Sequence, residues 1–495
     1  MKPHTLYTLL VGTAVAVAQA QEEIPTYIDT AFGWLPGSMR EAEVPPSLRS
    51  GMPAAQQHSR RHAGVPTSML LVEQSKRRSA AGADTRCCGN WQFFPSSPQH
   101  FMPYLDSIFV PGNTCAEPCA FVDDDPVSTT AQRLKYLLST VGLQYSAVLT
   151  YNFSHITPAP QQQQRDFSSF NCQASGKWFL AKSRDDRQGI FLTFEANWGQ
   201  GTNFSERRRS VQQSLGTLSR PQGSLRGGNG VFLPELALGY SGFNGRWVGM
   251  LGALDSSNYL DQNAYAASWH GNLTNSAFGS NPCLPLEWGN WGYLTAWQPV
   301  ENFYVMYATT GCNGGINENP FNHISSNYWV HVGELGLIFD DAWGMGPGTY
   351  RLQYTITRND GATGDGVACN FQQQLGRDSR LGFFTRCGYM DNDAASVTGV
   401  RATATAGLVL QAPFTSSGWG SRQNNDQVGL GLMWLRAAGT ERPYAHKDEY
   451  GLELTAVIQL TPTLYLQPDI QYIFNPVHAT RDEAIVMQLQ AVLSF

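Results

Sequence analysis

The chain has 495 residues, of which 15% are charged, 12% are aromatic and 49 are glycine. Its net charge of −6 argues against a nucleic-acid partner, which needs a concentrated basic surface. Mean hydropathy is −0.28, and beyond the N-terminal segment no stretch reaches the roughly 18 apolar residues of a membrane-spanning helix. Because only alternate residues of a transmembrane strand face lipid, a soluble exported protein and a transmembrane β-barrel both remain open. Periodicity must decide between them.

Residues 1–20 predict a secretory signal peptide. Lys2 supplies the positive start, residues 6–17 form an apolar run, and Ala18-Gln19-Ala20 is a cleavage site with small residues at both ends. We therefore expect the chain to be exported and the mature protein to begin at Gln21.

Residues 21–130 predict an N-terminal extension that is partly disordered and rich in Cys and Pro. Its basic runs are typical of solvated segments, and its role stays open between a periplasmic plug and a stalk.

Cys115 and Cys119 have the spacing of a metal pair, but neither a CxxC motif nor a His cluster accompanies them. Export favours loop disulfides instead, so we expect no metal or cofactor. The odd number of cysteines leaves at least one unpaired; they are Cys87, Cys88, Cys115, Cys119, Cys172, Cys283, Cys312, Cys369 and Cys387.

Residues 131–495 predict a short helix followed by strands. Leu134, Leu137 and Leu138 share one face of a helix over Ala131–Thr140, and from Leu143 onward the hydrophobic period becomes two. In the last strand Ile485, Met487, Leu489, Ala491, Leu493 and Phe495 lie on one face. Fourteen runs alternate in this way: 143–152, 190–198, 231–241, 246–254, 290–298, 301–309, 328–339, 349–358, 381–390, 402–412, 427–435, 450–460, 464–473 and 485–495.

The length of these runs favours a membrane. Most match the roughly 9–11 residues that a tilted strand needs to cross a bilayer, whereas strands of soluble sandwiches are typically nearer 5–6 residues. In hydrocarbon an open sheet edge would leave backbone groups unpaired, so the sheet must close. Aromatic residues near the predicted strand ends suit interfacial girdles; they are Tyr151, Trp198, Tyr240, Trp297, Trp343, Tyr389 and Trp434. The fold class is therefore all-β, a closed antiparallel transmembrane β-barrel.

The C-terminal segment resembles the carbohydrate-selective porins (the OprB-type family) of Gram-negative bacteria. The residues that carry the resemblance are Tyr450-Gly451-Leu452-Glu453-Leu454, Leu460-Thr461-Pro462, Leu466-Gln467-Pro468-Asp469-Ile470-Gln471-Tyr472-Ile473, Asn475-Pro476 and Leu493-Ser494-Phe495. A looser likeness runs back to about Arg133. The resemblance implies a barrel of 16 strands in the outer membrane, through which mono- and small oligosaccharides diffuse. Gly89-Asn90-Trp91 is at best a remnant of the family's Gly-Asp-Trp-Gly-Gly segment, and the extension 21–130 is atypical.

The strand phase also predicts which charged residues point into the lumen. Carboxylates and guanidinium groups across a constriction would offer acceptors and donors to sugar hydroxyls, while binding must stay weak enough for conduction. The candidate constriction residues are Glu195, Glu235, Glu334, Arg351, Arg386, Glu453 and Asp469.

Three other functions compete with this one. An enzyme lacks support, because neither a Gly-x-Ser-x-Gly elbow, a Walker loop nor an HExxH motif occurs. A soluble β-sandwich would have shorter strands. A barrel of general, ionic or other nutrient selectivity remains the main alternative. Small sugars and outer-membrane lipid are the expected partners, and the oligomeric state stays open between monomer and homotrimer.

Overall fold

The computed structural model describes a β-barrel together with parts of the segments that connect its strands. The residues described are Val127, 130–131, 134–135, 137–138, 141–157, 165–182, 188–201, 210–221, 230–266, 271, 273–286, 289–313, 324, 326–377, 379–411, 413, 426–439, 446–461, 463–479 and 481–494. The signal peptide, nearly all of the extension 21–130, and Cys87, Cys88, Cys115 and Cys119 lie outside them. The described residues from 130 to 138 are helical, as the leucine spacing predicts.

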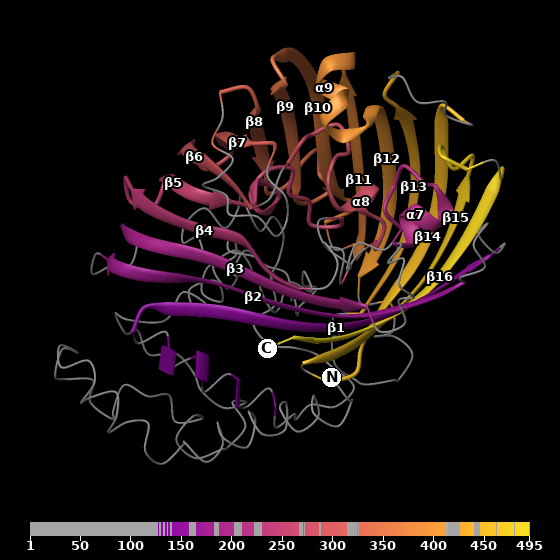
Figure 1. The fold of residues 1–495 in the computed structure, drawn as a ribbon. Coiled ribbons are helices and arrows are strands. Elements are labelled where there is room, and N and C mark those ends of the chain that lie inside the picture. The colour runs from indigo at the N-terminus through magenta and orange to yellow at the C-terminus, as the bar shows by residue number, and fades with distance from the viewer. Residues whose placement is uncertain are drawn as a thin grey trace. The chain divides into compact units, whose positions relative to one another are not determined.

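Sixteen antiparallel strands of the described part close into a single barrel (Figure 1). Each strand pairs with its neighbours in the chain, and the first strand closes the barrel against the last through a register that joins Val148 to Ser494. The strands are β1 (Leu143–Thr157), β2 (Asp166–Lys182), β3 (Gly189–Gly201), β4 (Gly230–Gly242), β5 (Trp247–Leu254), β6 (Asn290–Val300), β7 (Phe303–Gly311), β8 (Trp329–Phe339), β9 (Gly348–Asn359), β10 (Ala362–Gln374), β11 (Leu381–Met390), β12 (Val400–Gln411), β13 (Gln427–Ala437), β14 (Asp448–Gln459), β15 (Leu464–Phe474) and β16 (Glu483–Ser494).

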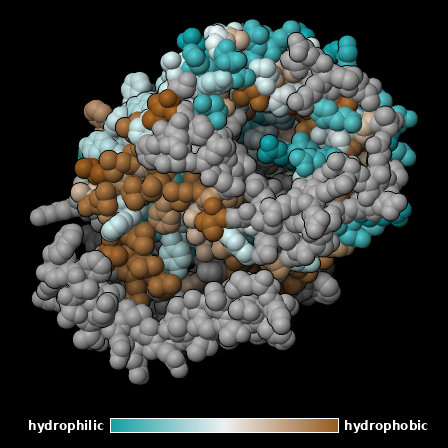
Figure 2. Space-filling model, in the orientation of Figure 1, coloured by the Kyte–Doolittle hydropathy of each residue, from teal (hydrophilic) through white to brown (hydrophobic). Residues whose placement is uncertain are grey.

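Apolar side chains cover the outside of the barrel. In β14 Tyr450, Leu452 and Leu454 are exposed, whereas Glu453 between them is buried, so the sequence-derived phase of this strand is confirmed. Hydrophobic residues gather on one flank of the surface in Figure 2, and hydrophilic residues gather at the end where helix α9 (Asn392–Thr398) lies. An apolar band bounded by polar ends is the surface that a bilayer requires. In the described part of the chain, no helix is long and apolar enough to cross a membrane.

The count of 16 strands confirms the number that the resemblance implies and corrects the 14 runs read from periodicity. The two runs missed are β2 and β10. In β2 the outward positions carry small residues, among them Cys172, Ala174 and Gly176, so hydrophobic alternation is faint. In β10 the glycines Gly364 and Gly366 occupy inward positions, and outward Asp365 is charged, so the alternation there is also faint. Backbone pairing with the strands on either side holds both in the sheet despite their weak patterns.

The connections differ strongly between the two ends of the barrel. At one end the strands are joined by short connections, such as 243–246 between β4 and β5 and 301–302 between β6 and β7. At the other end lie the long connections 202–229, between β3 and β4, and 255–289, between β5 and β6. Described parts of both long connections hydrogen-bond to inward side chains of distant strands. They therefore fold back into the barrel.

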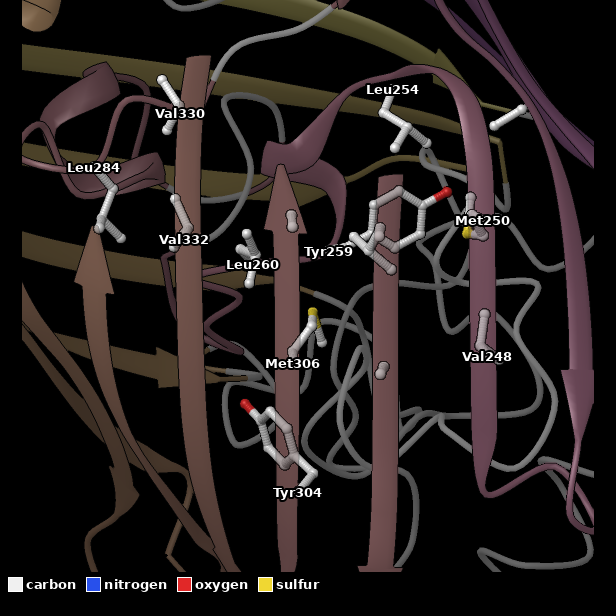
Figure 3. Close-up of a cluster of buried hydrophobic side chains, with 14 of the residues drawn as sticks. Val248, Met250, Leu254, Tyr259, Leu260, Leu284, Tyr304, Met306, Val330 and Val332 are labelled. Carbon is white, nitrogen blue, oxygen red and sulfur yellow. The ribbon is translucent and has the colours of Figure 1, made fainter. Parts of the chain in front are cut away.

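The inner wall of β5–β8 is mostly apolar, with Glu334 of β8 as its charged residue. Val248 and Met250 from β5, Met306 from β7 and Val332 from β8 are all buried and point inward (Figure 3). Leu260, from the connection that follows β5, packs against them. Hydrophobic burial thus fixes the start of this connection to one side of the barrel.

Candidate functional site

The segment 255–286, which we call the infolded segment, is anchored at its start by two carboxylates. Asn258 donates its side-chain N–H to Glu195 of β3 at 2.9 Å and to Glu235 of β4 at 3.3 Å. The Tyr259 hydroxyl also donates to Glu235. The two glutamates are register partners on adjacent strands and are fully buried. One amide therefore bridges two buried carboxylates and ties the segment to this wall.

Asp261 makes the central contact of the infolded segment. Its backbone N–H donates to Glu334 at 2.9 Å, and its carboxylate accepts from Arg386 at 2.9 Å and from Asn370 at 2.7 Å. Asp261 has a φ of 59°, in the left-handed region, which Asp tolerates better than most residues. A chain held in this uncommon conformation by three strands is fixed in place by its surroundings.

Two arginines on this side differ in how fully they are bonded. Arg386 donates to the Asp261 carboxylate and to the backbone carbonyls of Phe278 and Ala266, the latter at 2.7 Å. The N–H groups of its guanidinium that face the segment are therefore all used. Arg351 donates from Nε to the Tyr304 hydroxyl at 2.9 Å, while its Nη2 has no partner among the described residues. Arg351 thus retains a buried donor for a further ligand.

The far end of the infolded segment reaches the opposite wall. The Thr274 and Asn275 backbone N–H groups donate to Glu453 of β14, the second at 3.1 Å. Asp469 of β15 lies beside this contact and accepts from Gln471 at 2.9 Å and from Gln488 at 3.2 Å. Its second oxygen has no partner among the described residues.

A second inward segment, 210–221, packs beside the first. It contains α7 (Val211–Leu215), which a Ser210–Gln213 capping box starts and Gly216 ends in the left-handed conformation. Beyond the helix, the backbone N–H groups of Leu218 and Ser219 donate to Glu449 of β14 at 2.7 and 3.0 Å. The two segments also bond to each other, since Ser276 N–H donates to the Arg220 carbonyl at 3.0 Å.

Glycines of the wall make room for the infolded segment. A Cβ at Gly382 would lie 2.1 Å from the ring of Tyr265, and one at Gly431 would lie 2.7 Å from the ring of Phe278. Both glycines face inward, on β11 and β13. The absence of side chains at these positions lets the segment's rings lie directly on the sheet.

The stretch of inner wall from β14 through β16 to β3 is rich in polar residues. Buried amide and hydroxyl side chains line it; they are Ser146, Asn152, Asn171, Gln173, Ser175, Asn197, Gln467, Gln471, Gln488 and Gln490. Ser146 Oγ, Asn171 Oδ1, Ser175 Oγ and Asn197 Oδ1 have no hydrogen-bond partner among the described residues. The inward faces of β5–β8 carry no such atom in the described part of the chain. Inward polar atoms without a partner also occur on β9 and β12, at Arg351, Gln353, Thr355, Thr403 and Thr405. Among the described strands, β5–β8 thus form a continuous stretch of the inner wall that lacks them.

All seven charged residues singled out from the sequence have buried side chains on the inner wall. Glu195, Glu235, Glu334, Arg386 and Glu453 hold the infolded segment, whereas Arg351 and Asp469 keep an unmatched polar atom. A role in binding a permeant stays a prediction for each. The sequence reading missed the segment's own anchors, Asn258, Asp261 and Asn275. The available signal was the length of the polar stretch between the runs 246–254 and 290–298, since loops this long are usually functional.

Burial affects the ionisation of Tyr259 in the infolded segment. Removal from water, reinforced by the neighbouring Glu235 carboxylate, raises the pKa of Tyr259 well above its ordinary value of 10.0. The hydroxyl consequently stays protonated and remains a donor at neutral and mildly alkaline pH. Among the described residues, no group of three or more His, Cys, Asp or Glu side chains could hold a metal ion.

Comparisons with known proteins agree with this geometry. A family model described as carbohydrate-selective porin, OprB family, matches residues 126–495. The high-pH structure of Pseudomonas putida OprB is similar over 76% of this chain and all of that one, with 16% identity and a TM-score of 0.59. The low-pH structure of the same protein gives 14% identity over 74% of this chain and 96% of that one, with a TM-score of 0.44. A mutant of the Rh. blastica porin gives 9% identity over 71% of this chain and all of that one, with a TM-score of 0.46. No curated protein matches the chain.

Proposed function

The chain belongs to the OprB family of carbohydrate-selective porins, and from this premise we propose that sugars pass along the polar wall formed by β14–β16 and β1–β3. The infolded segment covers the apolar wall of β5–β8 and holds the constriction in place. The observation that carries this proposal is the group of unmatched polar atoms on Ser146, Asn171, Ser175 and Asn197. A buried polar atom without a partner costs about 1–3 kcal/mol, and water or a sugar hydroxyl would remove that cost.

The pairing of the strands places these atoms close together. Ser146 is opposite Ser175, and the neighbouring Gln173 is opposite Asn197. Amide and hydroxyl groups offer donors and acceptors without fixed charge, which suits hydroxyls pointing in several directions. Each contact is weak alone, as conduction requires.

Arg351 and Asp469 would contribute charge-assisted hydrogen bonds to the same permeant. Each has one polar atom left unmatched, Nη2 of Arg351 and Oδ2 of Asp469. The other five charged residues act through the infolded segment that they anchor, so their effect on sugar passage is one of positioning.

The test is single-channel conductance in a planar bilayer, titrated with glucose or maltose, for the wild type and for Asn171→Leu. We expect millimolar sugar to block the wild-type channel and equimolar amino acids to leave it open. Loss of one hydrogen bond should weaken the block about two- to tenfold in Asn171→Leu.

Thr309→Val is the matched control, because Thr309 also carries an unmatched hydroxyl but faces outward on β7. Its sugar block should equal that of the wild type. Openings indifferent to sugar would favour a general porin. Equal weakening in both variants would contradict the assignment of the polar wall.

The same proposal includes the export of the chain and the insertion of its barrel into a membrane. Residues 1–20 direct the chain to the periplasm, and the barrel inserts into the outer membrane of a Gram-negative bacterium. The role of the extension 21–130 stays open between a periplasmic plug and a stalk. Deletion of 21–130 with unchanged conductance would remove the plug role for this extension and leave the stalk.

A further inference from the structure

A groove crosses the outer face of the barrel over β11–β15. Its volume is about 370 Å³, and its lining is mainly apolar. The strand register places Ala404 of β12 beside Trp434 of β13. The same row continues through Tyr450 of β14 to Phe474 of β15. All four residues line the groove, so a small alanine side chain lies in one row with three aromatic rings. A hydrocarbon chain seated there would bury apolar surface.

The groove ends at the level of a membrane interface. Trp434 donates its indole N–H to Asp448 at 3.0 Å, while its side chain lines the groove. An indole with one polar and one apolar side is typical of the boundary between hydrocarbon and headgroups. β12 begins and β13 ends here, at the end of the barrel where helix α9 and the long connections 202–229 and 255–289 lie (Figure 1). Since the long loops of an outer-membrane barrel are extracellular, this interface belongs to the outer leaflet.

Two arginines lie next to each other just beyond the groove. Arg436 follows Trp434 by two positions on the same face of β13, about 7 Å further along the strand. Its register partner is Ala402. The register shifts by one residue between Val400 and Ala402, so Arg401 is an extra residue beside Arg436. Like charges on adjacent strands repel each other, and an anion bound between them would remove that cost.

Neighbouring side chains position the two guanidinium groups without neutralising both. Arg401 donates to the Tyr389 hydroxyl at 3.0 Å and lies over the ring, 5.6 Å from its centroid. Arg436 faces Asp448 at 3.9 Å, too far for a hydrogen bond, and its side chain is 49% exposed. Glu483 of β16, a further carboxylate at this end of the barrel, lies two strands beyond Asp448. Two cations therefore share one carboxylate on the outer face of β12–β14.

We propose that this site binds a phosphorylated, acylated lipid of the outer leaflet, with an acyl chain in the groove and a phosphate group between Arg401 and Arg436. Guanidinium groups bind phosphate through paired N–H donors, and basic side chains at a membrane surface attract anionic headgroups. The groove alone would accept any lipid chain, and the arginine pair alone would accept any phosphate. Together they select a molecule that carries both. The site depends on the proposed placement of the barrel in the outer membrane and not on the sugar selectivity of the lumen.

The experiment is native mass spectrometry of the full chain, freed of lipid in detergent and titrated with lipid A, a phosphorylated and acylated disaccharide. We expect one molecule to be retained per barrel. The double variant Arg401→Gln/Arg436→Gln should bind it about tenfold more weakly, because charge-assisted hydrogen bonds are lost. Arg358→Gln is the matched control, since Arg358 is exposed on the outer face of β9 at the same end of the barrel, and it should bind as the wild type does. Equal retention by the wild type and the double variant would overturn the proposal.

The groove is tested separately from the arginines. Ala404→Trp fills the groove and should also weaken retention of lipid A, whereas Ala456→Trp adds the same side chain outside it, on the outer face of β14, and should not. Inorganic phosphate is the competing ligand. Displacement of lipid A from the wild type by millimolar phosphate, with no effect of Ala404→Trp, would mean a site for free anions and would overturn the lipid assignment.

Removal of the phosphate groups from the lipid gives a test that needs no variant. Dephosphorylated lipid A should bind the wild type as weakly as intact lipid A binds the double variant, and equal binding of both lipids to the wild type would contradict the role of the arginines. Single-channel conductance of each variant should equal that of the wild type, because the substituted side chains face outward, and this shows that the barrel is folded. Absence of sugar block in the wild type would contradict the proposed function, whereas retention of lipid A decides the lipid site alone.

Discussion

Two stretches of the inner wall of the barrel are unlike. On β5–β8 most inward residues, such as Val248, Met306 and Val332, are apolar, and the infolded segment packs against them. On β1–β3 and β14–β16 many inward residues are amides and hydroxyls, several with unmatched atoms. The alternation that builds both stretches is the same, so what distinguishes them is only the chemistry of the inward face. The sequence of the inward face therefore decides which stretch of the wall buries apolar side chains of the infolded segment and which stretch offers hydrogen bonds.

The largest effect on the channel is expected from Arg386→Met, which should release the infolded segment from the wall. The change leaves Asp261 buried without its cation, and breaking a buried pair from one side costs about 3–5 kcal/mol. The infolded segment should detach at its centre, so single-channel conductance should rise and sugar block should fall. Arg436→Met is the control, because Arg436 is half-exposed and lies on the outer face of β13. Unchanged conductance in Arg386→Met would mean that Asp261 is not a main anchor.

A somewhat smaller effect is expected from Gly431→Val. The new side chain would overlap the Phe278 ring, and overpacking costs about 1–3 kcal/mol. The segment should shift away from β13 and produce a noisier, wider channel in bilayer recordings. Gly333→Val on the outer face of β8 adds the same side chain where nothing lies within 4 Å. If both variants behave alike, the close contact between Phe278 and the sheet at Gly431 has no special role in holding the infolded segment.

The unmatched guanidinium of Arg351 gives a test at the level of a single permeant contact. Arg351→Gln should weaken sugar block by about tenfold, since hydrogen bonds to charged groups are worth about 1.5–3 kcal/mol and glutamine retains part of this contact. Arg358→Gln, on the outer side of the same strand, should leave block unchanged. Titration of the channel with maltose measures both. Equal affinities for wild type and Arg351→Gln would remove Arg351 from the binding residues.

The smallest effect concerns pH. Because the pKa of Tyr259 is raised by burial and by Glu235, its hydroxyl contact is fully present below the ordinary value of 10.0 and is lost only as pH rises through the higher folded-state value. Ionisation of Tyr259 should therefore produce no step in conductance up to pH 10. Tyr259→Phe, which removes the hydroxyl, should likewise show no step near pH 10. A step near pH 10 in the wild type that is absent from Tyr259→Phe would contradict the burial of this group.

The strand phase could be predicted because it is a local property. Alternation in 450–460 and 464–473 correctly placed Glu453 and Asp469 inside, and every predicted charged residue is buried on the inner wall. Alternation does not reveal β2, whose outward positions carry small residues, or β10, whose inward positions include Gly364 and Gly366. The anchoring of Asp261 by Glu334 and Arg386 could not be foreseen, because it joins residues 73 and 125 positions apart through tertiary folding.

Cysteine accessibility tests most directly which wall sugars and water reach. Asn171→Cys places a thiol on the polar wall and Met306→Cys places one on the apolar wall, both facing inward. A bulky water-soluble thiol reagent is added during single-channel recording, with the wild type as the reference for native cysteines. The account predicts a stepwise loss of conductance in Asn171→Cys and none in Met306→Cys. Block of Met306→Cys with an unaffected Asn171→Cys would contradict it.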